Sequence, residues 1–395
     1  MGLDWLRHAN WLDAARVRGY LWLIALLNGV MLAWLIATSS GGIDRNGFLL
    51  GTDFLSFWAA GKVLLAQGNA YDAAAHIAVQ RTLYAGHSGY TAFFYPPPFL
   101  LVCAPLGLVG YFPALALWLT GTAGAFVAAL RPWLRGLSGW QLALVLTAFP
   151  AVLLTITHGQ SSFLAAALLG GGVWLAASGR KGWAGVLFGL AIIKPQFGLL
   201  IPLALLAAGE WRVILAAATT ALGFAAAATL AFGAEIWPAW YAASGAAQGA
   251  MAGGAIGFAK MQSVFAAARL AGAGTGLAYA LQGAVALACA ALTVHLFWRR
   301  GLTRESGAAL LVAALLTTPF VLDYDLLLLA FPLAVLADGP RPWEKSAALA
   351  GFVLPALARP LALTTNVAIA PLVLLVLFAL LLRRAHSPDA TRAPH

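Results

Sequence analysis

Residues 20–40, YLWLIALLNGVMLAWLIATSS, decide the fold class of this chain because they contain no charged side chain. A helix of about 20 apolar residues is long enough to cross the hydrocarbon core of a bilayer. The same character runs through the whole sequence, which is 62% hydrophobic and only 9% charged. A soluble domain carries roughly 25% charged residues. The sequence therefore predicts an all-α polytopic membrane protein and excludes a soluble enzyme, a secreted module or a disordered chain.

Outward from this first span, apolar stretches predict about 12 transmembrane helices in a single domain over residues 1–395. Residues 93–130 are long enough for two crossings, but one crossing plus a re-entrant or interfacial piece agrees better with the charges around them. Residues 183–209 are interrupted by Lys194-Pro195, and proline cannot continue the hydrogen bonds of a helix, so we expect a hairpin of two short helices. The other predicted spans are 140–157, 160–178, 213–233, 276–298, 304–322, 346–361 and 362–382, with a short one at 325–337.

The net charge of +10 predicts the orientation of these spans. Loops rich in Arg and Lys stay on the cytoplasmic side of a membrane. Arg16 and Arg18 precede the first span and Arg383-Arg384 follow the last, so we expect a cytoplasmic N-terminus and a cytoplasmic tail over 383–395. The predicted location is the bacterial inner membrane. Nucleic-acid binding is not predicted, because no basic cluster is interleaved with aromatic residues on a polar face.

The segment that follows the first span, residues 41–92, predicts a structured outer loop. Phe54, Phe57, Trp58, Gly61 and Leu65 fall at helical spacing, which is typical of an amphipathic helix lying in the membrane interface. A second short helix is expected from about residue 73 to 84.

With this topology, one set of polar residues gathers on the outer, periplasmic side of the membrane. Lys194 is the charge placed deepest in an apolar stretch, and a charge at membrane depth is by default a sign of function. A cation can hold a lipid phosphate, and a carboxylate can take a proton from an acceptor hydroxyl. The set comprises Asp53, His158, Gln160, Lys194, Gln196, Lys260, Gln262, Asp323 and Asp325.

No metal ion or other cofactor is expected at this site. His, Cys and carboxylate residues do not occur with the tight spacing of metal ligands. Asp323 and Asp325 leave open the alternative of a divalent ion held between two carboxylates.

Short motifs spread over roughly residues 50–335 occur in an order that resembles glycosyltransferase family 87. The strongest is the stretch Ala184 to Leu190 running into Lys194-Pro195-Gln196. The others are Gly51-Thr52-Asp53-Phe54, Ala60-Gly61-Lys62, Gly68 to Asp72, Tyr95-Pro96-Pro97, Ala104-Pro105-Leu106, Gly159-Gln160, Lys260 to Ser263 and Pro319 to Asp325.

The resemblance implies the GT-C fold, with the active site on the outer side of the membrane. It also implies a polyprenyl-phosphate sugar as donor, typically mannose, a lipid-linked or glycan acceptor, and transfer with inversion. The catalytic aspartate of the family lies in the first outer loop, and Asp53 matches it. Where family members often carry an aromatic-His pair, this chain has Asp323-Tyr324-Asp325.

A mechanism with one general base fits these residues. The leaving group of such a donor is already an anion, which needs charge stabilisation and no paired acid. Asp53 is the expected base, and Lys194 with Gln196 is the expected phosphate-binding pair. His158, Gln160, Lys260, Gln262, Asp323 and Asp325 are the expected substrate-binding residues.

Each of these roles has a structural alternative. Asp53 can cap the helix that follows it, and the Lys194 side chain can extend to the interface. Asp323 and Asp325 can be plain loop charges. For the whole chain, the alternative is a transporter or flippase for a lipid-linked sugar, since transporters also contain broken helices. The absence of an internal repeat and the gathering of polar residues on one side favour the enzyme.

Overall fold

The computed structural model describes residues 3–84 and 90–387, and within these ranges the regular secondary structure is helical, with isolated β-bridges in the connecting segments. This confirms the all-α prediction. Five of the described helices are long and apolar enough to cross a membrane, or six if one bent pair counts as a span. The expected count of about 12 is not confirmed by this criterion. The five are α2 (Ala14–Ala37), α6 (Tyr111–Leu130), α13 (Trp211–Phe232), α16 (Thr275–Arg300) and α19 (Glu344–Thr365).

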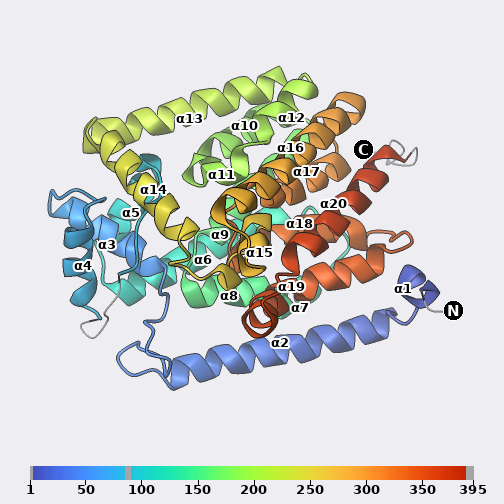
Figure 1. Cartoon of the computed structure of the whole chain (residues 1–395), viewed down its shortest axis with the longest axis horizontal. Coiled ribbons are helices and arrows are strands. Elements are labelled where there is room, and N and C mark those ends of the chain that lie inside the picture. Colours follow the sequence, from blue (N-terminus) through green and yellow to red (C-terminus); the bar gives the residue numbers. More distant parts are fainter. Residues whose placement is uncertain (1–2, 85–89, 388–395) are drawn as a thin grey trace.

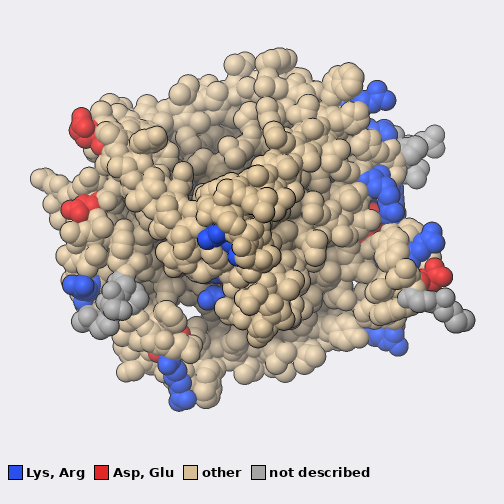
Figure 2. All heavy atoms as spheres, viewed as in Figure 1, with Lys and Arg blue, Asp and Glu red and all other residues tan. Residues whose placement is uncertain are grey.

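The helices run between two charged ends of the molecule. Helices α2 and α13 form opposite edges, and α1 (Asp4–His8) and the end of α20 (Ala370–His386) lie at the same end (Figure 1). Lys and Arg gather at that end, and a broad band with little charge separates it from the other (Figure 2). Such a band is what a bilayer would cover.

Two short helices, α9 (Ser162–Ala177) and α17 (Arg304–Thr317), form the centre of the core. Their small residues bring neighbours into close contact: a Cβ atom added to Gly170 would lie 2.2 Å from Cζ of Phe331 on α18 (Ala330–Ala337). The core therefore depends on glycine at this position.

The predicted span 140–157 is broken into α7 (Gly139–Ala148) and α8 (Pro150–His158), which meet at an angle of 69°. The break follows from Pro150, which cannot supply a helical N–H. The side-chain amide of Asn28 on α2 donates to the freed carbonyl oxygens of Thr147 (2.9 Å) and Ala148 (3.2 Å). A contact from a distant helix thus satisfies the break within the apolar region.

The predicted hairpin at 183–209 has its break where Lys194-Pro195 places it. Four short elements make up this segment, and Lys194 stands between the second and third. They are α10 (Lys181–Leu190), the 3₁₀ turn η2 (Ala191–Ile193), α11 (Pro195–Gly198) and α12 (Ile201–Ala207). Residues 93–130 contain one long helix, α6, after the short pieces η1 (Pro97–Phe99) and α5 (Leu100–Leu106). This matches the alternative of one crossing preceded by a shorter piece.

The loop 41–92 contains two helices as expected, but the first is buried within the protein rather than exposed along one face. Helix α3 (Phe54–Leu65) is almost entirely buried, because apolar residues cover all its sides and Gly61 lies against the backbone of Cys103 on α5. Helix α4 (Ala73–Arg81) is mostly at the surface, although it buries His76, whose pKa is lowered by this burial. Residues 85–89 of the predicted loop lie outside the described residues.

The remaining elements are the last helix and four elements between α13 and α18. Helix α20 continues through Arg384 to His386, so the predicted tail 383–395 begins as helix, and its residues 388–395 lie outside the described part of the chain. The turn between α19 and α20 falls at 366–369, later than expected from the sequence. The other elements are α14 (Ile236–Ala252), η3 (Phe258–Lys260), α15 (Val264–Leu270) and η4 (Asp323–Leu329).

Candidate active site

Asp53 lies where the loop before α3 is bonded to the end of α8. Its backbone N–H donates to the carbonyl oxygen of His158 (2.9 Å). Gly159 ends α8 with a φ of 63°, a conformation that favours glycine, and a Cβ there would lie 2.6 Å from Cβ of Phe54. The glycine of the Gly159-Gln160 motif therefore allows the two loops to approach each other.

The Asp53 carboxylate makes no capping bond to α3, so the capping alternative does not describe this geometry. Its Oδ2 accepts a hydrogen bond from Nε2 of Gln160 (3.0 Å). The orientation of that amide is fixed at its other end, where Oε1 accepts from the hydroxyl of Tyr95 and the backbone N–H of Ser161, both at 2.7 Å. Asp53 is half-buried, and its Oδ1 has no hydrogen-bond partner among the described residues. One oxygen is thus held and the other remains able to accept a proton.

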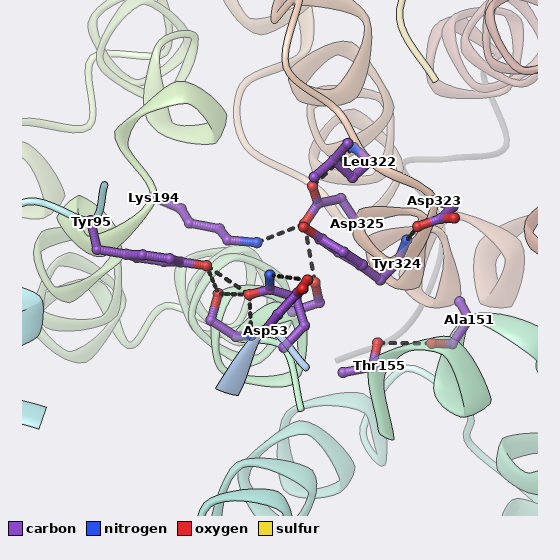
Figure 3. Close-up of polar contacts among 12 residues, drawn as sticks. Asp53, Tyr95, Ala151, Thr155, Lys194, Leu322, Asp323, Tyr324 and Asp325 are labelled. Atoms are coloured by element: carbon purple, nitrogen blue, oxygen red, sulfur yellow. Dashed lines mark hydrogen bonds and ion pairs between the residues drawn. The ribbon is translucent and has the colours of Figure 1, made fainter. Parts of the chain in front are cut away.

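Lys194 is buried and forms an ion pair with Asp325, with Nζ 2.7 Å from Oδ1 (Figure 3). The two side chains are only 6% and 4% exposed. Asp325 also accepts from the hydroxyl of Ser162 (3.0 Å) and the backbone N–H of Leu322 (3.1 Å). Lys194 therefore does not extend to the interface, and Asp325 is not a plain loop charge. Such extra hydrogen bonds help to offset the free-energy cost of taking the two charges out of water.

These contacts form one connected group, because Gln160, Ser161 and Ser162 are consecutive. We refer to it as the polar cluster. Its members come from the start of α3, the segment before η1, the α8–α9 junction, the break at Lys194 and the start of η4. They are Asp53, Tyr95, Gln160, Ser161, Ser162, Lys194 and Asp325.

Tyr324 brings two more of the predicted site residues, His158 and Lys260, next to the polar cluster. The Nζ atoms of Lys194 and Lys260 lie 5.5 and 5.3 Å from the centre of its ring, and the ring of His158 lies 5.6 Å away. Ammonium groups at this distance are attracted to an aromatic ring. His158 and Lys260 thus join the site through Tyr324.

The other predicted residues are less closely connected. The amide of Gln262 donates to the carbonyl oxygens of Ala259 and Lys260, so it holds its own loop. Gln196 lies two residues after Lys194, and its side chain has no hydrogen bond to the described residues. Asp323 is directed away from Lys194 and Asp53 (Figure 3), and its nearest cation is Arg359 on α19.

The structure offers no cluster of metal ligands among the described residues. Asp325 pairs with Lys194 and Asp323 with Arg359, so the two carboxylates do not converge on one point. This geometry does not favour the alternative of an ion held between them.

Sequence reasoning missed Ser161 and Ser162. It assigned no site role to Tyr95 or to Arg359, although Arg359 is a charge within an apolar stretch. Tyr95 had a signal, since it opens the Tyr95-Pro96-Pro97 motif. The serines had only their position next to Gln160, and nothing in the sequence linked Arg359 to Asp323.

Comparison with known proteins gives one family. The model of glycosyltransferase family 87 matches residues 93–322, more than half of the chain. No curated protein and no solved structure matches the sequence.

Proposed function

Because the chain belongs to glycosyltransferase family 87 and is a membrane glycosyltransferase, we propose that it moves a hexose, with mannose as first candidate, from a polyprenyl-phosphate donor to a lipid-linked or glycan acceptor. The reaction takes place on the outer face of the bacterial inner membrane. Its scaffold is a single GT-C domain with about 12 crossings, several of them made by the short helices. An even number of crossings agrees with the position of α1 and the end of α20 at one end of the molecule.

The observation that carries the proposal is the geometry of Asp53. Its carboxylate is half-buried, fixed by one amide, and has one oxygen without a partner among the described residues. In the proposed step the acceptor oxygen attacks the anomeric carbon from the face opposite the phosphate. The bond to the phosphate oxygen breaks, its electron pair leaves with polyprenyl phosphate, and the acceptor proton passes to Asp53. A positioned base of this kind contributes roughly 10²–10⁴ in rate.

Lys194 and Gln196 are the proposed partners of the donor phosphate. An ammonium group has three donors, and Asp325 takes one of those of Lys194. The remaining donors and the amide of Gln196 can bind phosphate oxygens. They would stabilise charge on the leaving group beside a buried ion pair. Gln160, His158, Lys260, Gln262, Asp323 and Asp325 are the proposed substrate-binding residues around them.

Membranes from cells that express the chain, supplied with radiolabelled polyprenyl-phosphate mannose, provide the test. Wild type should transfer label to membrane lipids or glycans, and Asp53→Asn should lose about 10²–10⁴ in rate while still binding the donor. Asp44→Asn is the matched control, because Asp44 is a loop carboxylate bonded only within its own turn. Full transfer by Asp53→Asn would remove Asp53 from the mechanism and point to Asp325.

The orientation has its own test. A reporter fused after Gly68 or Gly245 should be periplasmic, and one fused after Arg300 should be cytoplasmic. A cytoplasmic signal after Gly68 would place the site on the wrong side for this function.

A transporter or flippase for a lipid-linked sugar is the second candidate, favoured by the helix break at Lys194 within the apolar interior. The two functions differ in their product. Reconstituted protein that moves the labelled lipid across vesicles without forming a new glycosidic bond would favour transport.

A further inference from the structure

Asp323 has an oxygen that its surroundings do not satisfy. The side chain is 1% exposed, and its Oδ1 accepts from the backbone N–H of Tyr324 (3.0 Å). Its Oδ2 is buried without a hydrogen bond in the described structure. The nearest cation is Nη1 of Arg359 at 3.6 Å, which is an ion-pair distance but too long for a hydrogen bond. A buried carboxylate oxygen left in this state is costly.

The guanidinium of Arg359 also lacks hydrogen-bond partners among the described residues. It lies in α19 between Pro355 and Pro360, about 22 Å along the helix from Glu344. Its side chain is 42% exposed, and it makes no hydrogen bond to the described residues, although a guanidinium offers five donors. A cation within an apolar span normally has such partners. Since α19 packs against both η3 and η4, Arg359 lies beside the elements that carry Lys260 and Tyr324.

The two groups together select for one kind of ligand. The buried charge of Asp323 repels a phosphate, and the charge of Arg359 repels an amine. A hydroxyl can donate to Oδ2 of Asp323, while a neighbouring hydroxyl oxygen accepts from the guanidinium. Resting on the proposed function, we infer that Asp323 and Arg359 form a sugar-binding subsite for a pair of neighbouring hydroxyls. The hydroxyls belong either to the transferred hexose or to the acceptor sugar.

Binding to the purified full-length chain in detergent tests this subsite without relying on turnover. Three probes are used: a short-chain polyprenyl-phosphate mannose, the same polyprenyl phosphate without sugar, and octyl α-mannoside. Arg359→Gln and Asp323→Asn should weaken binding of one mannose-bearing probe by about tenfold or more, because hydrogen bonds to charged groups are lost. Binding of the sugar-free phosphate should not change.

The matched control is Lys181→Gln. Lys181 is as exposed as Arg359, at 40% against 42%; it forms an ion pair with Glu210 and lies outside the polar cluster. It should leave all three affinities unchanged. The double variant Asp323→Asn with Arg359→Gln leaves no unpaired charge and serves if a single variant does not fold.

The outcomes show whether the subsite binds the transferred hexose or the acceptor sugar. They also distinguish failure of this inference from failure of the proposed function. Weaker binding of the mannosyl donor alone assigns the subsite to the transferred hexose, and weaker binding of octyl mannoside alone assigns it to the acceptor. Equal loss for the sugar-free phosphate would overturn the inference in favour of an anion site. Unchanged affinity for every probe would reduce the pair to an internal contact and leave the proposed function standing. Failure of wild type to bind either mannose-bearing probe would overturn both.

Discussion

The two helices at the edges of the molecule and the two at its centre differ in almost every property. Helices α2 and α13 are long and apolar, with only 11% of their most apolar stretch buried. Helices α9 and α17 are shorter, and most of their residues are buried, 12 of 16 in α9 and 12 of 14 in α17. Hydropathy therefore finds the helices that lie exposed at the surface of the molecule. The shorter ones, too short to pass as spans by length, form the centre of the core, and α9 carries Ser162 of the polar cluster.

This difference predicts which substitutions change the stability of the protein or its activity. Ser162 begins α9, and Asp325 lies in η4, eight residues after the end of α17. A change at the centre therefore alters packing or charge that supports the site, whereas most changes at the edge meet only lipid.

The largest effect should come from Lys194→Ala, which leaves Asp325 buried and unpaired. Breaking a buried ion pair costs about 3–5 kcal/mol, and donor binding should weaken as well. Lys194→Arg should keep part of both. Thermal unfolding in detergent and donor titration are the measurements. Combining Lys194→Ala with Asp325→Asn should recover much of the stability but not the donor affinity. Unchanged donor affinity in Lys194→Ala would move the phosphate site to Lys260.

Glycine to alanine substitutions compare centre and edge directly. Gly170→Ala on α9 places a methyl group 2.2 Å from the ring of Phe331, and such overpacking costs about 1–3 kcal/mol. Gly223→Ala on α13 meets nothing within 4 Å and should stabilise the helix by about 0.5–1 kcal/mol. Unfolding of the two variants side by side is the measurement. Equal effects would contradict the contrast between centre and edge.

Asn28→Leu should be an exception among substitutions on the edge helices, because we expect it to lower both stability and activity. It removes the bonds to the carbonyl oxygens of Thr147 and Ala148, and polar contacts between membrane helices contribute about 0.6 kcal/mol, up to about 1.7. Because the bend leads into α8 and Gln160, transfer activity should fall together with stability. Met31→Leu on the exposed part of α2 is the control. Wild-type stability in Asn28→Leu would mean that the break needs no partner.

The smallest effect is expected for Leu222→Ala on α13. Leu222 is 71% exposed, and substitutions away from packed or bonded groups usually change stability by less than about 0.5 kcal/mol. A loss above 1 kcal/mol in the same unfolding assay would show that this edge packs against a second protein chain.

The sequence was sufficient for the helical class, the break at Lys194 and the family. Each rests on a local signal: apolar length, a proline after a charge, or the order of short motifs. It placed Asp53 and Gln160 on one side but not in contact, because their bond joins residues 107 positions apart. The pairing of Lys194 with Asp325 and the burial of α3 depend on packing between distant segments. The bend at Pro150 was missed because its flanking residues are as apolar as those of a straight span.

The contact between Asn28 and the α7–α8 break has a consequence for biogenesis. The two sides of this contact are 119 and 120 residues apart, so α2 leaves the ribosome long before its partners exist. Until then the amide of Asn28 lies in lipid without the carbonyl oxygens that it finally bonds. Helix α2 can take its final place only after Ala148 has been synthesised and inserted. Docking of the first helix is therefore a delayed step of membrane assembly, completed on a chain that is still growing or has just been released.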